Sequence, residues 1–212
     1  LLIAAQAPPL GRRVLLSRFD DEVHYLDKHQ ALYSNRWRGG VVTPEGHLSV
    51  ARFALEGNTP VWTYAIDDAL LEKRIFMVYG ENTTVVVYRL VEASAPLTLH
   101  AKALVTARSH HHLRTGDADS LPVEAMDDGV RVTAEHHDTS FVVVSRGAQT
   151  QVHAGHDVYR GLELRIEAAR GFDHHDDLRH AATFTSTLHK GDSVALVCST
   201  AQNPPTDIAA AQ

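Results

Sequence analysis

Cysteine is nearly absent from this chain, since Cys198 is the only one among 212 residues. A single thiol cannot form an intramolecular disulfide, and it cannot build a zinc site from several thiolates. The sequence therefore favours a reducing compartment, and we expect the protein in the cytoplasm.

Basic clusters and long apolar runs are also missing. The chain has 20 Lys and Arg against 26 Asp and Glu, a formal net charge of −6, and no dense basic run. Binding to phosphates needs clustered basic side chains, so we expect no nucleic-acid partner. The apolar opening segment 1–13 lacks a basic start and is far too short to span a bilayer, so we expect no membrane partner.

Signatures of self-contained catalysis are missing as well. The chain has no nucleophile elbow and no dinucleotide fingerprint, and the helix that a phosphate cradle needs does not follow Gly39-Gly40. Glycoside hydrolysis requires two opposed carboxylates, which sequence alone cannot pair. Acidic candidates are Glu45, Glu56, Asp67, Glu72, Glu81 and Glu163. We expect no catalytic residues and no cofactor in this chain.

What the chain does contain is a recurrent alternation of apolar and polar residues. In segment 97–105 the odd-numbered residues are apolar, whereas Thr98, His100 and Lys102 lie between them, and a helix would scatter this pattern. Similar segments rich in β-branched and aromatic residues predict further strands at 22–26, 61–66, 83–91, 130–135, 140–146, 162–168, 182–188 and 193–199. The short spacings between them leave no room for crossover helices and predict an all-β antiparallel sandwich.

Two segments depart from this pattern. Segment 106–129 reads as a long loop with at most one helical turn, and long loops on rigid sheets commonly carry binding sites. Pro204-Pro205 cannot continue a strand ladder. We therefore expect one domain over 1–202 and a linker over 203–212.

Fifteen histidines occur, many of them in clusters. Imidazole and carboxylate groups suit metal ions, but adjacent residues of a strand point to opposite faces, and none of the clusters has a known metal-binding spacing. We therefore expect no metal and interpret the clusters as solvated polar loops, with a metal site as the alternative interpretation. The clusters are His110-His111-His112, His136-His137-Asp138, His153 with His156-Asp157, and His174-His175-Asp176-Asp177 with His180.

The most informative stretch is YSNRWRGGVVTPEGH, residues 33–47. Aromatic rings pack against the C–H faces of sugars, and Asn and Arg donate hydrogen bonds to hydroxyl pairs, so Asn35, Arg36 and Trp37 on a loop fit a sugar. The alternative is that Trp37 belongs to the core, because Trp is highly buried on average. Both interpretations stay open at this point.

Four blocks of the chain resemble the N-terminal domain of bacterial and archaeal glycogen debranching enzymes, the amylo-α-1,6-glucosidase family. They follow one another in order over nearly the whole chain, and the second and third are the most specific. The blocks are APPLGRRVLLSRFDDEV, YSNRWRGGVVTPEGH, PVWTYAIDDALLEKRIFMVYGENTTVVVYRLVEAS and RGFDHHDDLRHAATF, residues 7–23, 33–47, 60–94 and 170–184.

This resemblance implies a β-supersandwich akin to the galactose mutarotase fold. It also implies that an (α/α)6 barrel carrying the hydrolytic carboxylates follows in the complete protein. The chain starts at Leu1 rather than at Met, and we expect an N-terminally truncated fragment. The implied role is noncatalytic: the domain positions branched α-glucan and scaffolds the glycosidase barrel that hydrolyses α-1,6 branch points.

The resemblance also assigns site residues. A family block that ends a long strand corresponds to LVTARSHH, residues 104–111, in which Arg108 and His111 keep their places. For Asn35, Arg36 and Trp37, the resemblance favours a contact with sugar more strongly than their residue types alone do. The expected partners are branched α-glucan and the C-terminal catalytic domain of the same chain, and the isolated fragment could dimerise through the face that the barrel covers.

Two alternatives remain beside this hypothesis. The sandwich could be a structural partner that docks the barrel and never touches sugar. Less favoured is an aldose 1-epimerase with a His base and a Glu acid, which rests on fold analogy alone.

Overall fold

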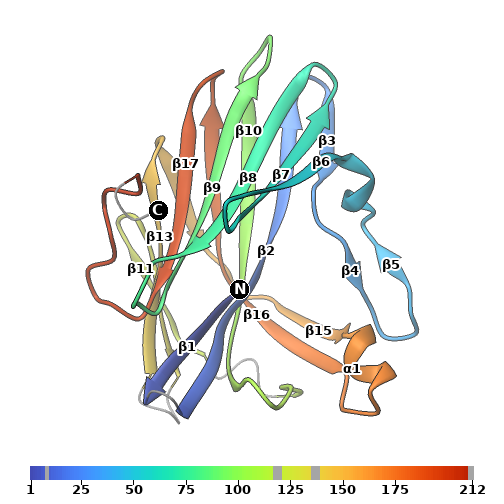
Figure 1. Ribbon diagram of the computed structural model, residues 1–212, viewed down its shortest axis with the longest axis vertical. Helices are drawn as coiled ribbons and strands as arrows, with labels where there is room; N and C mark the ends of the chain where they lie inside the picture. Colours follow the sequence, from blue (N-terminus) through green and yellow to red (C-terminus); the bar gives the residue numbers. More distant parts are fainter. Residues whose placement is uncertain (8–9, 117–120, 135–138, 210–212) are drawn as a thin grey trace.

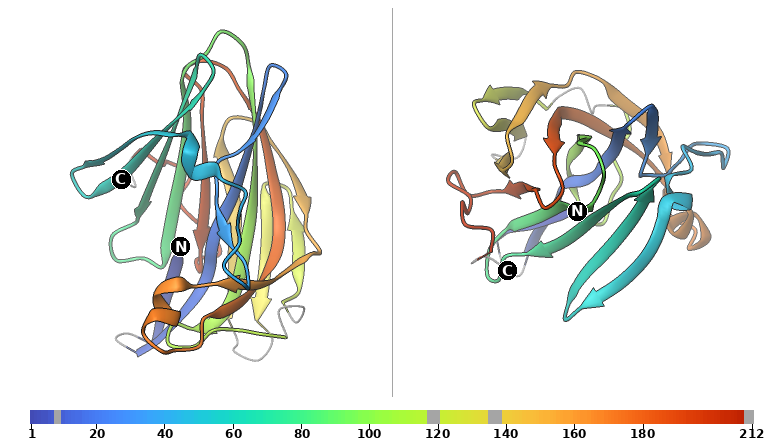
Figure 2. Two further views of the ribbon diagram at one scale, coloured as in Figure 1. Left: turned by 90° about the vertical axis from the view of Figure 1, so that its right-hand side faces the viewer. Right: turned by 90° about the horizontal axis from the view of Figure 1, so that it is seen from above.

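The computed structural model describes residues 1–7, 10–116, 121–134 and 139–209. Two antiparallel sheets face each other across one large apolar core (Figures 1 and 2). This arrangement confirms the all-β antiparallel sandwich that the alternation predicted.

The first sheet has seven strands, in the order β1-β2-β10-β16-β14, with β3 paired to β2 and β15 paired to β16. Its two longest strands, β2 and β16, flank β10 at the centre. The strands are β1 (Leu2–Ala7), β2 (Leu10–Tyr25), β3 (Lys28–Ala31), β10 (Leu97–Ser109), β14 (Thr150–Ala154), β15 (Val158–Glu163) and β16 (His175–Leu188).

The second sheet has eight strands, in the order β11-β12-β13-β17-β9-β8-β7-β6. These are β6 (Val50–Glu56), β7 (Thr59–Ile66), β8 (Ala69–Met77), β9 (Thr83–Glu92), β11 (Val123–Met126), β12 (Gly129–Ala134), β13 (Thr139–Gly147) and β17 (Ser193–Ser199). Outside both sheets lie the pair β4 (Asn35–Arg36) and β5 (Val42–Thr43), the 3-10 helix η1 (Gly46–Ser49) and the helix α1 (Arg165–Ala169).

The core lies between the sheets because the apolar residues of each strand share one face. Leu97, Leu99 and Ala101 of β10 are buried at 0%, 1% and 0% exposure, as the alternation in this segment predicted. Phe19 of β2 meets Phe184 of β16 edge to face, with ring centroids 6.5 Å apart. The polar residues of the same strands are thereby turned to the outer face of the first sheet.

The strand predicted over 162–168 is wrong beyond Glu163. Residues Arg165–Ala169 form α1, because this run of Arg, Glu and Ala consists largely of good helix formers. Gly171, with a φ of +77°, ends the helix, and the N–H of Phe172 donates to the carbonyl of Glu167 at 3.0 Å. The short helix turns the chain back from β15 into β16.

The long loop predicted over 106–129 is shorter than expected. β10 continues to Ser109 because β2 still pairs with it there, with Ser109 opposite Arg13. Val123–Met126 form β11, a short edge strand that the alternation did not reveal. Residues 117–120 of this segment, Glu135 of the strand predicted over 130–135 and the cluster His136-His137-Asp138 lie outside the described residues.

The segment predicted as a linker lies against the second sheet as far as Ile208. Pro204 is buried, and Ile208 packs on an apolar cluster of the outer face of this sheet, formed by residues such as Val85 and Val197. That residues 203–212 link this domain to another one stays a prediction.

Candidate functional site

The outer face of the first sheet carries a continuous polar surface. Residues directly opposite one another in an antiparallel pair lie on the same face. Three polar residues of β10 each oppose one residue of β2 and one threonine of β16. We call these nine residues the polar face: Thr98, His100 and Lys102; His24, Glu22 and Asp20; Thr187, Thr185 and Thr183.

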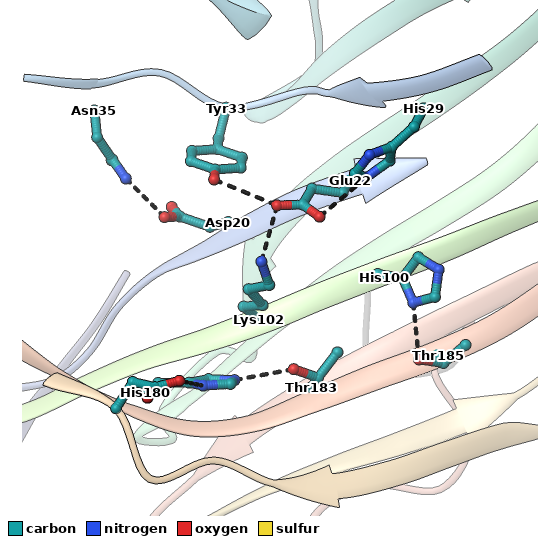
Figure 3. A network of polar contacts seen from close by, with 11 residues as sticks. Asp20, Glu22, His29, Tyr33, Asn35, His100, Lys102, His180, Thr183 and Thr185 are labelled. Carbon is teal, nitrogen blue, oxygen red and sulfur yellow. Dashed lines mark hydrogen bonds and ion pairs between the residues drawn. The ribbon is translucent and has the colours of Figure 1, made fainter. Parts of the chain in front are cut away.

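Glu22 is the centre of a hydrogen-bonded network on the polar face (Figure 3). Lys102 Nζ lies 2.9 Å from Glu22 Oε1, and His29 Nε2 lies 3.2 Å from Oε2. Partial burial alone would raise the pKa of Glu22, but the hydrogen bond and charge of Lys102 outweigh it and lower this pKa. Glu22 is therefore an ionised hydrogen-bond acceptor at neutral pH.

A second polar group lies next to it, where Asp20 and Asn35 are each 0% exposed. Asn35 Nδ2 donates to Asp20 Oδ2 at 2.7 Å, and Arg18 Nη1 donates to Asn35 Oδ1 at 2.6 Å. Burial raises the pKa of Asp20 to about 6, against the opposing effects of Asn35 and Arg18. Asp20 Oδ1 has no hydrogen-bond partner among the described residues.

The segment that carries Asn35 crosses the outer face of the first sheet, and we call residues 32–43 the strap. It is held at one end by a hydrogen bond from the Leu32 N–H to the Asp21 carbonyl of β2, at 2.8 Å. At the other end the Arg38 N–H donates to the Gly161 carbonyl of β15, at 2.9 Å. In Figure 1 the strand pair formed by β4 and β5 lies on the same side of the molecule as β15 and α1.

Trp37 joins the strap to the sheet. Its ring packs on a small apolar cluster of the outer face, formed by Leu104, Leu162 and Leu178, and is stacked with Tyr159 at 6.3 Å between centroids. The indole N–H donates to the Thr43 carbonyl at 3.1 Å. Trp37 is only partly buried, so it packs on the sheet and also presents surface to solvent.

The neighbouring arginines have different surroundings. Arg36 is partly buried and its Nη1 donates to the Gly40 carbonyl at 2.8 Å, within a turn where Gly39 and Gly40 have φ angles of +91° and +84°. Such angles favour glycine, which explains the Gly-Gly pair. Arg38 is exposed.

A pocket of about 600 Å³ lies farther along the same face, between the end of β10 and α1. Arg108 and His111 both line it. Arg108 Nε lies 3.0 Å from Asp176 Oδ2, and its Nη1 donates to the His112 carbonyl at 2.8 Å. The other lining residues are His110, His112, Leu113, Leu164, Glu167, Arg170, Phe172 and Asp173.

The structure thus brings the five predicted site residues to one side of the first sheet, in two groups. Asn35, Arg36 and Trp37 belong to the strap, whereas Arg108 and His111 line the pocket. Asn35 holds the strap in place and has no exposed surface with which to contact a ligand directly. The strap and the pocket are connected by the end of β15, since Leu162 of β15 packs with Trp37 and Leu164, between β15 and α1, lines the pocket.

Sequence reasoning did not single out Asp20, Glu22, Lys102 or Tyr159 as site residues, nor Tyr33, whose hydroxyl donates to Glu22 Oε1 at 3.4 Å. The alternation over 97–105 turned Lys102 to the outer face, and this was the available signal. The partner of Lys102 is Glu22 of β2, which lies 80 residues away in the sequence. No pattern within a single sequence reveals the register in which β2 and β10 pair.

Two of the histidine clusters contain adjacent rings in contact at a tilt, with interplanar angles of 40° and 42°. His110 and His111 have ring centroids 3.8 Å apart, and His174 and His175 have centroids 4.3 Å apart. Across the part of the chain that the structure describes, no group of three or more His, Cys, Asp or Glu side chains is arranged to hold a metal ion. Within the same residues, no helix is long and apolar enough to cross a membrane.

Comparison with known proteins identifies a family and similar solved structures. The family described as "Glycogen debranching enzyme N terminal" matches residues 1–195. No curated protein matches the chain. A solved bacterial glucoamylase, crystallised with acarbose, is 10% identical with a TM-score of 0.45. The match covers 94% of this chain but only 28% of the glucoamylase chain.

Proposed function

Because the chain belongs to the glycogen debranching enzyme N-terminal family, we propose that it is a noncatalytic domain that positions branched α-glucan for a glycosidase barrel. The barrel would hydrolyse the α-1,6 branch points with its own pair of carboxylates. The partners in this proposal are glycogen or a limit dextrin and the catalytic domain of the same protein.

The observation that carries the proposal is the setting of Trp37. This aromatic ring is fixed by Tyr159 and by the Leu104 cluster, yet it keeps a solvent-facing surface. A rigid aromatic ring beside planar hydrogen-bonding groups suits the alternating apolar and hydroxyl faces of a glucosyl unit. Planar groups are supplied by the Glu22 carboxylate of the polar face and the Arg36 guanidinium of the strap, and the Lys102 ammonium is a further donor beside Glu22.

The pocket supports the same proposal at a second place. Phe172 is 57% exposed at its rim, and Arg108, His111 and Glu167 supply donors and acceptors. We propose that a branch of the glucan that lies over Trp37 extends to this pocket along β15.

Fluorescence of a Trp62→Phe variant tests the proposal, because Trp37 is then the only tryptophan. Titration with branched maltodextrin should shift or quench its emission, with a dissociation constant in the millimolar range, which is about −4 kcal/mol. The same protein should release no glucose from limit dextrin. Emission that does not change with added maltodextrin, or release of glucose, would overturn the proposal.

A purely structural role is the second candidate, and two exposed side chains favour it. Ile166 of α1 is 68% exposed, and Phe172, three residues after the helix, is 57% exposed. Exposed apolar residues of this kind are typical of interfaces between domains. In that case the domain docks the barrel through α1, and the emission of Trp37 does not respond to sugar.

The aldose 1-epimerase alternative has less support. Glu22 is the glutamate of the polar face, and the lowered pKa that Lys102 gives it leaves it without a proton to donate at neutral pH. A mutarotation assay on glucose and galactose tests this alternative directly.

We also propose a cytoplasmic location, on the single buried cysteine. Burial raises the pKa of the Cys198 thiol to about 12, so this thiol stays protonated and unreactive.

A further inference from the structure

The last strand of the second sheet, β6, has a free edge. The strand order of this sheet ends at β6, which pairs with β7 on one side, and no other described strand pairs with it. In the right-hand view of Figure 2 the hairpin of β6 and β7 projects from the body of the sandwich. Such an edge offers unpaired N–H and C=O groups to another strand.

Pro60 shows which backbone groups of β6 point outward. Leu55 lies opposite Pro60 of β7, and proline has no N–H, so this pair is of the kind that exchanges no hydrogen bonds. The two kinds of pair alternate along an antiparallel ladder. The backbone N–H and C=O groups of Phe53 and Leu55 therefore point toward the free edge.

The side chains of this edge are apolar on one face and charged on the other. Phe53 and Leu55 are 55% and 65% exposed and share the face of Trp62, whose ring centroid is 5.1 Å from that of Phe53. Arg52 and Glu56 lie on the opposite face. Arg52 is exposed and forms no ion pair with another described residue, whereas Glu56 is 47% exposed and contacts Arg74 through Oε2 alone.

The order of these residues is symmetric about Ala54. The run Arg-Phe-Ala-Leu-Glu, residues 52–56, reads charged, apolar, small, apolar, charged, with opposite charges at its two ends. If a second copy pairs antiparallel with Ala54 opposite Ala54, then Phe53 faces Leu55 and Arg52 faces Glu56, twice each. A register centred on Phe53 instead sets Arg52 opposite Ala54.

We propose that β6 is a self-association edge, on which a second copy of this chain adds its own β6 in the register centred on Ala54. The two chains are related by a twofold axis, and their eight-stranded sheets join into one. Phe53 and Leu55 exchange backbone hydrogen bonds across the axis and bury their side chains against each other. One strand pair is a small interface, so the dimer is weak, with a dissociation constant of about 0.1 mM.

Charge reversal in two separate variants tests this register. Sedimentation equilibrium of the 212-residue chain between about 10 µM and 1 mM should show a monomer–dimer equilibrium. Arg52→Glu sets Glu against Glu56 of the partner, and Glu56→Arg sets Arg against Arg52, so each variant alone should weaken the dimer at least tenfold. An equimolar mixture of the two variants should form the mixed dimer, because every charged pair is then complementary.

Arg165→Glu is the matched control, since Arg165 is an exposed arginine of α1 away from β6. This variant should dimerise like the parent chain. Thermal unfolding should show that Glu56→Arg, which loses the contact with Arg74, is still folded. If Glu56→Arg does not fold, Leu55→Lys is the second test. This variant removes the apolar pair of Leu55 and Phe53 but keeps the contact between Glu56 and Arg74, and it should also weaken the dimer at least tenfold.

A chain that stays monomeric up to about 1 mM would overturn the proposal. A dimer that survives Arg52→Glu and Leu55→Lys unchanged would overturn it too, because another surface would then hold the two copies together. Failure of the mixed variants to associate, with both of them folded, would show that the register is wrong.

Discussion

Asn35 of the strap donates a 2.7 Å hydrogen bond to Asp20 of β2, and neither side chain exposes any surface to solvent. The contact joins the strap to the polar face below it. Asn35→Ala leaves the buried carboxylate without this donor and removes the acceptor of Arg18, so the free energy of unfolding should fall by about 1–3 kcal/mol. Urea unfolding measures this loss.

Arg38→Ala is the control for that variant, because Arg38 is an exposed side chain of the same strap. Its effect should stay within about 0.5 kcal/mol. Equal losses for the two variants would show that the hydrogen bond to Asp20 does not hold the strap.

Asp20 should also give the protein a pH-dependent stability. Its pKa in the folded chain is raised to about 6, chiefly by burial, from 3.8. Between these values the folded protein binds a proton that the unfolded chain has released, so stability falls as the pH rises from about 4 to about 6 and then levels off. The full loss is about 3 kcal/mol at 1.36 kcal/mol per pH unit.

Asp20→Asn isolates this effect from other acids, such as Asp176, whose pKa burial also raises. The difference in unfolding free energy between the parent chain and the variant should change between pH 4 and 6 and stay constant above about pH 7. A difference that does not depend on pH would contradict the raised pKa of Asp20.

Trp37 should contribute to stability and to glucan binding separately. Trp37→Ala uncovers Leu104 and its neighbours, and because the ring is only partly buried the cost should be about 2 kcal/mol, below that of a core tryptophan. Trp37→Phe should recover part of this stability and part of the binding. Chemical unfolding and maltodextrin titration of the two variants give the comparison, and a Trp37→Ala variant that keeps the full affinity would exclude Trp37 as a sugar contact.

Arg108 and His111 line one pocket but should behave differently. Arg108→Met leaves the Asp176 carboxylate without its cation, and since both side chains are largely buried the protein should lose about 3 kcal/mol of stability. His111 is exposed, so His111→Ala should change stability by less than about 0.5 kcal/mol. If His111 contacts glucan, His111→Ala should nevertheless bind branched maltodextrin more weakly than the parent chain. Unchanged affinity would remove His111 from the proposed site.

The sequence predicted those parts of the fold that depend on local alternation. Leu97, Leu99 and Ala101 lie in the core as expected, because the two faces of a strand are set by sequence alone. The segment over 162–168 was mispredicted because the alternation of Leu162, Leu164, Ile166 and Ala168 continues from the end of the strand into the short helix. The strand in fact ends at Glu163, and Gly171, with a positive φ angle, ends the helix that follows.

The site was predictable in part. Trp37 and its neighbours were identified from their residue types, and the resemblance pointed to Arg108 and His111. The pairing of Lys102 with Glu22 and of Asn35 with Asp20 depends on the register between strands and on the path of the strap. Those are tertiary relationships, and the alternation within a single strand contains no information about them.

The account rests on the claim that the strap of a noncatalytic domain binds branched α-glucan. Calorimetric titration of the chain with branched maltodextrin tests this most directly, with Trp37→Ala as the variant and Arg38→Ala as its matched control. The account predicts heat with a dissociation constant in the millimolar range for the parent chain and for Arg38→Ala, and none for Trp37→Ala. No heat from the parent chain, or the same heat from Trp37→Ala, would contradict it.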